Sequence, residues 1–383
     1  MRITYIANSR IPTERANGVQ IMNMCQAFAV AGHEVTLLVP RRINPVKGDA
    51  FDYYGISRSF KLRYLPTLDL VEWGRIGFLI QAATFAVSAL FHTLRERPEA
   101  VYARDEVSLW LLSFFRRQLF WEVHTNRSNV IIARVLKKCD GIVAITAGIK
   151  RFFVEKGYPE KNFMVAHDGV NLESFKKISG DKRALRSELG LPDSRLIASY
   201  IGKYKTMDQG KGVDELIHVF PEILSAVPNA FLLIVGINAD EQAEVKAVIE
   251  RAGIPAESHA IVGHVPHAKA LAYQKASDAL IINYPNQPHF AHYASPLKLF
   301  EYMASGNAIV ASDLPSTREV LSDESACFVR PDDERDLARG IIETFKHPEL
   351  AKSLGAAAFA KVQQYTWQHR AEAIVAFMSS RAS

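Results

Sequence analysis

The sequence of 383 residues has little of what marks a secreted or metal-binding protein. Its three cysteines, Cys25, Cys139 and Cys327, lie far apart and form neither a CxxC pair nor another metal-ligand spacing. Cysteines this sparse are typical of a reducing compartment, so we expect three buried thiols in a cytoplasmic protein. The chain runs from Met1 directly into a strand-like pattern, which predicts that no signal peptide is present.

Long apolar runs are also scarce, and one stretch alone approaches the length of a membrane span. Between Ile76 and Leu94 the only ionisable side chain is His92. Gln81, Thr84 and Ser88 interrupt this stretch with polar groups. We therefore expect an amphipathic helix that is buried or lies at an interface, rather than one that crosses a bilayer.

Charge is nearly balanced over the whole chain but not along it. The net charge is +5, yet residues 1–172 carry 23 basic and 15 acidic side chains, whereas residues 173–383 carry 23 and 26. A basic half suits nucleic acid, an anionic membrane surface or an anionic small molecule. No helix-turn-helix, zinc-finger or aromatic RNA-binding motif accompanies it, so we expect no nucleic-acid partner.

Strand-like runs alternate with helical patterns, which predicts an α/β fold with helices on both faces of parallel sheets. A polar stretch from Glu173 to Arg195 separates two series of strands and suits an interdomain connection followed by one short helix. We expect two Rossmann-like, doubly wound domains with ligands at the carboxyl ends of the strands. The expected strands are 3–7, 35–39, 62–65, 100–102, 120–123, 141–145, 164–166, 197–201, 231–235, 260–262, 280–282, 308–311 and 326–329.

The most informative segment is the dozen residues from Ser295 to Gly306. Ser295 and Pro296 form a turn that opens an amphipathic helix, with Leu297, Phe300 and Met303 expected on its buried face. The free amide groups at the start of such a helix bind phosphate, and the helix dipole favours an anion.

Two charged residues follow in the same helix. Lys298 lies in the first turn, where the dipole disfavours a cation and an anionic ligand would explain it. Glu301 lies one turn further, where a carboxylate accepts hydrogen bonds from a ribose diol. Gly306 is the expected left-handed end of the helix before the strand at 308–311. The combination predicts a nucleotide site; the alternative is an ordinary core helix of an α/β domain.

This segment and the two-domain pattern resemble the retaining glycosyltransferases of family 4, also called group 1, which have the GT-B fold of two Rossmann-like domains facing a central cleft. The resemblance implies that the donor diphosphate binds the helix start and that Glu301 holds the ribose. The family motif contains a second glutamate, separated from this one by seven intervening residues, and Tyr293 occupies that position here. Because that glutamate usually lies near the donor sugar, a protein carboxylate at the anomeric carbon is not expected. The donor-binding residues implied here are Ser295, Pro296, Leu297, Lys298 and Glu301.

A lysine-rich loop follows the first strand of the second series. Gly202 and Lys203 come directly after the strand, and Lys211 precedes the next helix. Cations at these places suit a pyrophosphate leaving group. The resemblance implies that Gly202 contacts the donor and that Lys203 and Lys211 act in catalysis. The spacing is longer than usual in the family, so Lys205 is an alternative to Lys203, and a solvated loop is the alternative to both.

The loop from Asn8 to Val19 is too long for a simple turn between the first strand and a helix expected near Gln20, which predicts a functional role. Gly18 would let the backbone approach a phosphate. The resemblance implies that Gly18 lies against the donor diphosphate. Arg10 and Arg15 are then candidates for binding an anionic acceptor.

Polar residues follow two further strands of the first series. His124 comes just after the strand at 120–123, at the edge where ligands bind, and the resemblance places it next to the donor sugar. Arg104 occupies a similar edge and is a weaker acceptor-binding candidate. His167 also follows a strand, but its neighbours Asp168 and Gly169 resemble the family's turn into the hinge, so we expect a structural role there.

No Asp-x-Asp pair occurs in the sequence. Metal-dependent glycosyltransferases of the other main fold use that pair to hold a divalent ion on the diphosphate. The resemblance implies instead that lysines, helix amides and Gly18 neutralise the charge, so we expect neither a metal nor another cofactor.

These observations predict a metal-independent, hexosyltransferase-type enzyme that moves a sugar from a nucleotide-diphosphate sugar to an acceptor hydroxyl. A cell-surface glycan or lipid-linked acceptor fits the basic first half, with the protein cytoplasmic or peripheral at the inner membrane face. The expected domains are an acceptor-side domain over 1–176 with a crossover helix over 366–383, and a nucleotide-sugar domain over 177–365. Two alternatives stay open: a nucleotide-sugar 2-epimerase, and a non-catalytic subunit that binds nucleotide or glycan.

Overall fold

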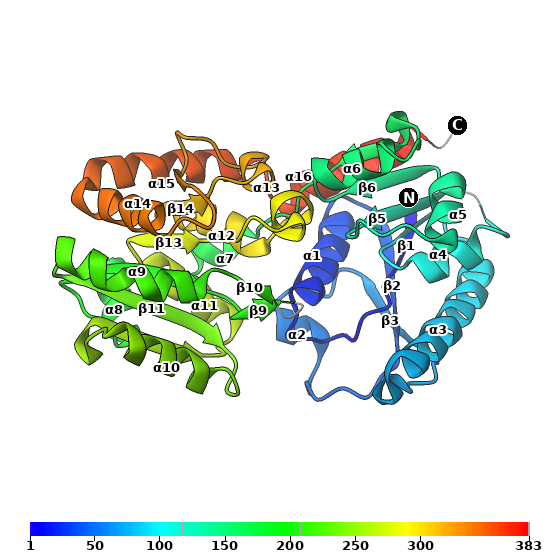
Figure 1. The fold of residues 1–383 in the computed structure, drawn as a ribbon. Coiled ribbons are helices and arrows are strands. Elements are labelled where there is room, and N and C mark those ends of the chain that lie inside the picture. The colour runs from blue at the N-terminus through cyan, green and yellow to red at the C-terminus, as the bar shows by residue number, and fades with distance from the viewer. Residues whose placement is uncertain (117, 207–208, 382–383) are drawn as a thin grey trace. The chain divides into compact units, whose positions relative to one another are not determined.

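A computed structural model describes residues 1–381 apart from 117, 207 and 208 (Figure 1). The chain folds into two compact units. The first comprises Met1–Gly169 together with Trp367–Ser383, and the second comprises Val170–Thr366. The end of the chain thus belongs to the unit that its beginning forms.

The first unit is built on a seven-stranded sheet in the order β3-β2-β1-β4-β5-β6-β7, and every strand pair is parallel. The strand order reverses beside β1, so the switch point lies between β1 and β4, where doubly wound sheets bind ligands. The strands are β1 (Arg2–Ile6), β2 (Glu34–Pro40), β3 (Lys61–Leu65), β4 (Ala100–Ala103), β5 (Leu119–Val123), β6 (Gly141–Ala144) and β7 (Phe163–Val165). The helices are α1 (Ala16–Val30), α2 (Ala50–Tyr54), η1 (Val71–Trp73), α3 (Gly74–Glu96), α4 (Glu106–Leu112), α5 (Val130–Lys138), α6 (Ala147–Val154), η2 (Glu160–Asn162) and α16 (Trp367–Ser379).

The second unit repeats this plan with six parallel strands in the order β12-β11-β8-β13-β14-β15 and a switch point between β8 and β13. Its strands are β8 (Leu196–Ile201), β11 (Ala230–Ile237), β12 (His259–Gly263), β13 (Ala279–Ile282), β14 (Ala308–Ser312) and β15 (Cys327–Val329), with a hairpin of β9 (Lys205–Thr206) and β10 (Gln209–Gly210). Its helices are α7 (Leu172–Lys176), α8 (Lys182–Leu189), α9 (Val213–Ala226), α10 (Gln242–Ala252), η3 (Ala256–Ser258), α11 (His267–Ala276), η4 (His289–Tyr293), α12 (Leu297–Ser305), α13 (Pro315–Arg318), α14 (Glu334–Lys346) and α15 (Pro348–Val362).

The central strands are nearly continuous apolar runs because helices cover both faces of each sheet. All residues of β13 and β14 are buried, as are all residues of β4 and β6. Such apolar runs predict buried parallel strands, and each of the thirteen expected strands overlaps an observed one. The β9–β10 hairpin was not predicted.

Two local expectations were wrong. The polar stretch that begins at Glu173 contains two short helices, α7 and α8, rather than one, because Asn171 and Asp181 each cap a helix start through the side chain. Of the three cysteines, Cys25 and Cys139 are buried free thiols, but Cys327 is only partly buried.

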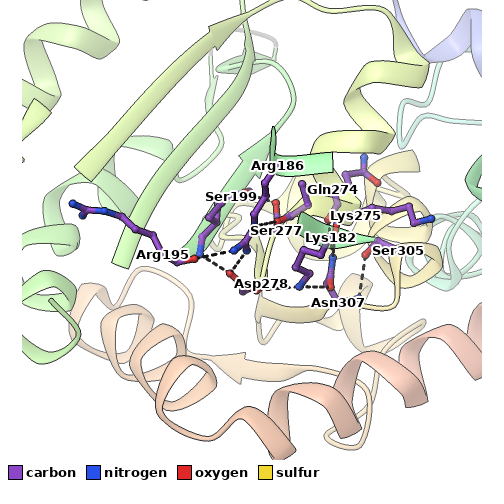
Figure 2. A network of polar contacts seen from close by, with 12 residues as sticks. Lys182, Arg186, Arg195, Ser199, Gln274, Lys275, Ser277, Asp278, Ser305 and Asn307 are labelled. Carbon is purple, nitrogen blue, oxygen red and sulfur yellow. Dashed lines mark hydrogen bonds and ion pairs between the residues drawn. The ribbon is translucent and has the colours of Figure 1, made fainter. Parts of the chain in front are cut away.

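A polar network ties helices to the amino ends of strands in the second unit (Figure 2). The carboxylate of Asp278, just before β13, accepts hydrogen bonds from Lys182 Nζ at 3.0 Å, from Arg186 Nη2 at 2.5 Å and from the backbone amide of Ile197 at 2.8 Å. Arg186 also donates to the carbonyl of Ala276 at 2.9 Å. One carboxylate thereby holds α8, β8 and β13 together at this edge.

Candidate functional site

The predicted donor residues of the second unit gather at the opposite edge, where β8 and β13 end. Gly202 follows β8 with a φ of 149°, and Gly212 precedes α9 with a φ of 76°. A Cβ atom on Gly212 would lie 1.7 Å from the carbonyl oxygen of Asn283, which follows β13. Only glycine allows this approach, which brings the start of α9 against the switch point.

Lys298 projects into this edge from the first turn of α12. Its Nζ atom lies 3.8 Å from the ring centroid of Tyr200 and 5.1 Å from that of Tyr284. The atom is buried and has no hydrogen-bond partner among the described residues. Burial first, and then Lys211, holds the pKa of Lys298 well below its usual value. Two aromatic faces and the Coulombic attraction of Glu301 are weak compensation for a buried ammonium group, so an anionic ligand would stabilise it.

Lys211 and Lys203 add to this excess of positive charge. Burial, followed by the neighbouring Lys203, lowers the pKa of Lys211 to about 8. Within the part of the chain that the structure describes, neither lysine forms an ion pair. Lys205, the alternative to Lys203, is instead bound to Glu244, with Nζ 2.8 Å from Oε1. The structure therefore gives Lys205 a partner of its own and leaves Lys203 beside Lys211.

The start of α12 lies where the sequence places it, although its buried face differs. Pro296 is the N-cap residue and Ser295 precedes it, so both lie at the helix start with Leu297 and Lys298. Leu297 is only partly buried, and Leu299 is buried in its place together with Phe300 and Met303. The helix ends at Gly306 with a φ of 73°, as predicted.

Glu301 is held in a fixed orientation by two side chains from α11. Its Oε1 atom lies 2.7 Å from Nε2 of His267, and its Oε2 atom accepts from Nε2 of Gln274 at 3.1 Å. Burial raises the pKa of Glu301, but His267, Gln274 and Lys298 lower it by a larger amount. The pKa therefore lies below its usual value, and the group stays ionised. An ionised carboxylate has about four acceptor positions. Each oxygen therefore retains capacity for one hydroxyl of a diol.

Neither His267 nor Gln274 was predicted from the sequence as a site residue. Burial lowers the pKa of His267, but Glu301 more than offsets this, and the result is a raised pKa. A histidine opening a helix just after β12, at the carboxyl edge of the sheet, was the available signal.

Tyr293, which stands in the place of the family glutamate, ends the π-helical turn η4 just before α12. Its ring lies 5.9 Å from that of His292. Turns of this type are rare and often occur at functional sites. The turn marks the segment between β13 and α12 as a place where this chain departs from regular helix.

In the first unit, a buried carboxylate organises the carboxyl edge of β5. Glu122 is fully buried in this strand. Its Oε1 atom lies 2.6 Å from His124 Nε2 and its Oε2 atom lies 3.2 Å from Arg370 Nη1 of α16. Gln20 and Tyr102 also donate to it. Burial raises the pKa of Glu122, but Arg370 and then His124 bring it well below the ordinary value, so the carboxylate is ionised.

His124 is neutral in this setting. Burial, and then Arg104, lowers its pKa to about 4. A neutral imidazole that donates through Nε2 to Glu122 keeps Nδ1 as an acceptor. Arg104 joins the same network, with Nη1 2.5 Å from the side-chain oxygen of Gln20. The structure thus brings together two of the predicted residues, His124 and Arg104.

The other predicted residues of this unit lie in the first loop and helix. Arg10 binds Glu14, with Nη2 2.9 Å from Oε2, and Arg15 is exposed at the N-cap of α1. Helix α1 begins at Ala16 rather than near Gln20, so Gly18 lies inside its first turn. A Cβ atom at Gly18 would lie 2.1 Å from the hydroxyl of Tyr54, so packing already requires glycine there.

Glu122, Arg370, Gln20 and Tyr102 were not predicted as site residues. A charged residue within the otherwise apolar strand Leu119–Val123 was the signal for a buried ion pair, but its partner lies 248 positions away. His167 has the expected structural role: its Nδ1 lies 3.1 Å from the carbonyl of Ile145, and its own carbonyl accepts from Arg370.

Comparison with known proteins finds a family match for each of the two units. Residues 181–361 match the glycosyl transferases of group 1, and residues 18–174 match glycosyltransferase family 4. The chain is 28% identical to the phosphatidyl-myo-inositol mannosyltransferase of Mycobacterium tuberculosis (strain H37Rv) over 370 residues, which are 91% of this chain and 89% of that protein. It is 28% identical to the enzyme of the same name from Mycolicibacterium smegmatis over 179 residues, and there it spans only 43% of the relative.

Solved structures show the same architecture. The crystal structure of Anabaena HepE in complex with UDP superposes with a TM-score of 0.78 at 14% identity, covering 99% of this chain and 100% of that chain. Sucrose-phosphate synthase from Thermosynechococcus elongatus gives a TM-score of 0.79 at 17% identity, covering 99% of each chain. These likenesses confirm the predicted fold of two Rossmann-like domains.

Proposed function

We propose that this chain, which belongs to the group 1 (family 4) glycosyltransferases and has their GT-B fold, transfers a sugar from a nucleoside-diphosphate sugar to an acceptor hydroxyl with retention of configuration. The observation that carries the proposal is the buried, unpartnered Nζ of Lys298 beside Lys211, at the switch point of the second sheet. Solved neighbours bind UDP and UDP-glucose, and the mycobacterial relatives are named mannosyltransferases, which supports this class of donor.

The donor-binding residues divide in this proposal between the ribose and the diphosphate of the donor. Glu301 accepts hydrogen bonds from the ribose diol, while His267 and Gln274 fix its orientation. Lys203, Lys211, Lys298 and the amides at the start of α12 bind the diphosphate. These groups stabilise the negative charge that grows on the diphosphate as the bond to the sugar breaks. His124 remains the predicted contact to the sugar.

Tyr293 favours displacement on one face of the sugar rather than through a covalent intermediate on a protein carboxylate. The bond from the anomeric carbon to the phosphate oxygen breaks, and the acceptor oxygen bonds to the same face. The departing phosphate oxygen takes the proton of the acceptor hydroxyl. The protein then needs no carboxylate at the anomeric carbon, only cations at the leaving group.

Charge neutralisation by lysines and helix amides makes a divalent metal unnecessary in this mechanism. Transferase activity is therefore expected to persist in excess EDTA. Loss of activity in EDTA and its restoration by Mg²⁺ or Mn²⁺ would refute the hypothesis that the diphosphate is bound without a metal ion.

The acceptor is expected to be anionic or lipid-linked. Residues 1–172 carry the net positive charge of the chain, and the exposed Arg15 forms no ion pair among the described residues. Arg10 and Arg104 have partners within the protein, so for them acceptor binding requires an exchange of partners.

The decisive experiment is a calorimetric screen of UDP, GDP and ADP sugars, followed by an assay of donor hydrolysis without acceptor. We expect nucleotide sugars of one base to bind. We also expect slow release of the matching nucleoside diphosphate as water hydrolyses the donor. Binding without any release or transfer would favour the non-catalytic subunit. Isomerisation of the sugar with the nucleotide still attached would favour the epimerase. Absence of binding to every nucleotide would overturn the donor site itself.

A further inference from the structure

The helix α3 carries an apolar surface that the proposed transfer reaction does not use. Trp73, just before α3, and Ile76, Leu79, Val87 and Phe91 in it are 45–71% exposed. With Ala83, also exposed, they recur every three or four residues and share one side of the helix, which we call the α3 face. From Ile76 to Phe91 this face is about 22 Å long. Contiguous exposed apolar surface of this kind marks an interaction site.

From Gln81 onward the opposite side of α3 is part of the core of the first unit, whereas Phe78, earlier on that side, is 48% exposed. Gln81, Ala82, Phe85 and Ala89 are buried there, where the helix packs against α4, β2 and β3. The helical segment 71–96 is long and apolar enough to span a bilayer, but 44% of its 18-residue apolar stretch is buried within the protein. A helix whose other side is occupied by its own sheet lies along a surface rather than being surrounded by lipid.

Positive charges border the α3 face. Arg75 and Arg95 project about 100° to either side of Ile76 around the helix, so they flank the apolar stripe near its two ends. Arg97 follows the helix, and Arg63 of β3 is close enough to affect the titration of His92. Two glutamates, Glu72 and Glu96, lie near the helix ends and offset part of this charge.

We propose that the α3 face docks the first unit onto an anionic lipid bilayer, with α3 lying in the interface and its arginines on the lipid phosphates. Apolar residues on one side with arginines on both flanks complement an anionic bilayer, which offers hydrocarbon below and negative charge at the surface. Two copies of the face placed together would instead oppose like charges. If the chain is a transferase, docking would also place its acceptor at the membrane. This statement about the acceptor rests on the proposed function, whereas docking itself does not.

Co-sedimentation of the full chain with vesicles tests docking without any catalysis. We expect binding to vesicles of phosphatidylcholine with phosphatidylglycerol, little binding to phosphatidylcholine alone, and weakening as salt rises past about 0.15 M, where the Debye length is about 8 Å. The double variant Ile76→Asp/Phe91→Asp should bind at least tenfold more weakly, because each change removes an apolar side chain worth roughly tenfold in partitioning. The pair Arg75→Gln and Arg95→Gln should lose roughly fivefold per arginine.

Phe359→Asp is the matched control, because Phe359 is a 46% exposed apolar residue on α15 of the other unit. It should bind vesicles as the unchanged protein does. Nucleotide binding by calorimetry should be the same in all variants, which shows that they are folded and separates failure of docking from failure of the donor site.

Three outcomes would overturn the proposal. One is equal, negligible binding to neutral and anionic vesicles at low salt. Another is binding that the aspartate and glutamine variants leave unchanged. The third is a concentration-dependent dimer in sedimentation velocity that Ile76→Asp/Phe91→Asp abolishes without lipid, which would make the α3 face an interface between two copies.

Discussion

The two edges of the six-stranded sheet differ in how their cations are paired. At the amino edge, Lys182 and Arg186 share the carboxylate of Asp278 (Figure 2). At the carboxyl edge, Lys298 has no hydrogen-bond partner among the described residues and lies over two tyrosine rings beside Lys211. Cations at one edge are therefore hydrogen-bonded to a carboxylate, whereas Lys298 at the other edge has only the Coulombic attraction of Glu301.

Under the proposed function, the difference separates charges that hold the fold from charges that bind the donor. A buried cation without a counter-ion lowers stability, whereas removal of one member of a buried pair is strongly destabilising. Sites that bind ligands commonly retain such a cost because the ligand removes it. The comparison thus predicts opposite stability effects for substitutions at the two edges.

The largest expected effect is at the amino edge. Asp278→Ala should lower the free energy of unfolding by about 3–5 kcal/mol, because it leaves Arg186, which is 6% exposed, without its carboxylate. Urea unfolding of the full chain measures this. Asp313→Ala is the control: it removes the exposed partner of Arg318 and should cost less than about 1 kcal/mol. Equal losses in the two variants would remove the distinction between the edges.

At the carboxyl edge, Lys298→Met should act in two directions. It should weaken nucleoside-diphosphate binding by about 1.5–3 kcal/mol, because a charge-assisted contact to phosphate is lost. It should also raise the free energy of unfolding without ligand by about 1–2 kcal/mol, because a buried amine without a hydrogen-bond partner among the described residues is replaced by an apolar side chain of similar length. Calorimetry and urea unfolding on one preparation measure both. A stability loss would show that Lys298 belongs to the fold.

Glu301 should contribute to binding by a similar amount. Glu301→Gln should weaken binding by about 1.5–3 kcal/mol without unfolding the unit, because the ribose hydroxyls lose a charged acceptor. Calorimetry with the 2′-deoxy nucleotide sharpens the test. The deoxy analogue should bind the unchanged protein more weakly than the ribonucleotide, and the gap should shrink in Glu301→Gln. An unaltered gap would assign the ribose to other residues.

The smallest effect concerns pH. A bound diphosphate raises the pKa of Lys211 above its value of about 8, so this lysine contributes fully to affinity below pH 8. The contribution is lost as pH rises above 8, by at most about tenfold per pH unit. The decline should be smaller in Lys211→Arg, which stays charged throughout. Dissociation constants measured from pH 7 to 9.5 decide this, and a flat profile would contradict it.

The sequence predicted the thirteen main strands and the lysines of the carboxyl edge because these features are local. Apolar runs mark buried parallel strands, and Lys298 and Lys211 lie next to the elements that position them. It did not predict the partners Asp278, His267 and Gln274, nor Arg370, because they come from distant parts of the chain. Periodicity locates elements, whereas pairing across a fold depends on which elements meet. Leu297 illustrates the limit even within a helix, since Leu299 is buried instead.

The ion pair between Glu122 and Arg370 has a consequence for synthesis of the chain. Glu122 is fully buried in the first unit, yet its cation is supplied by α16, which is made after the whole second unit. During translation the first unit therefore contains a buried carboxylate without this cation until α16 has left the ribosome. A chain that stops before Trp367 would hold a complete second unit and an unfinished first one. Completion of the amino-terminal unit thus depends on prior synthesis of the whole second unit.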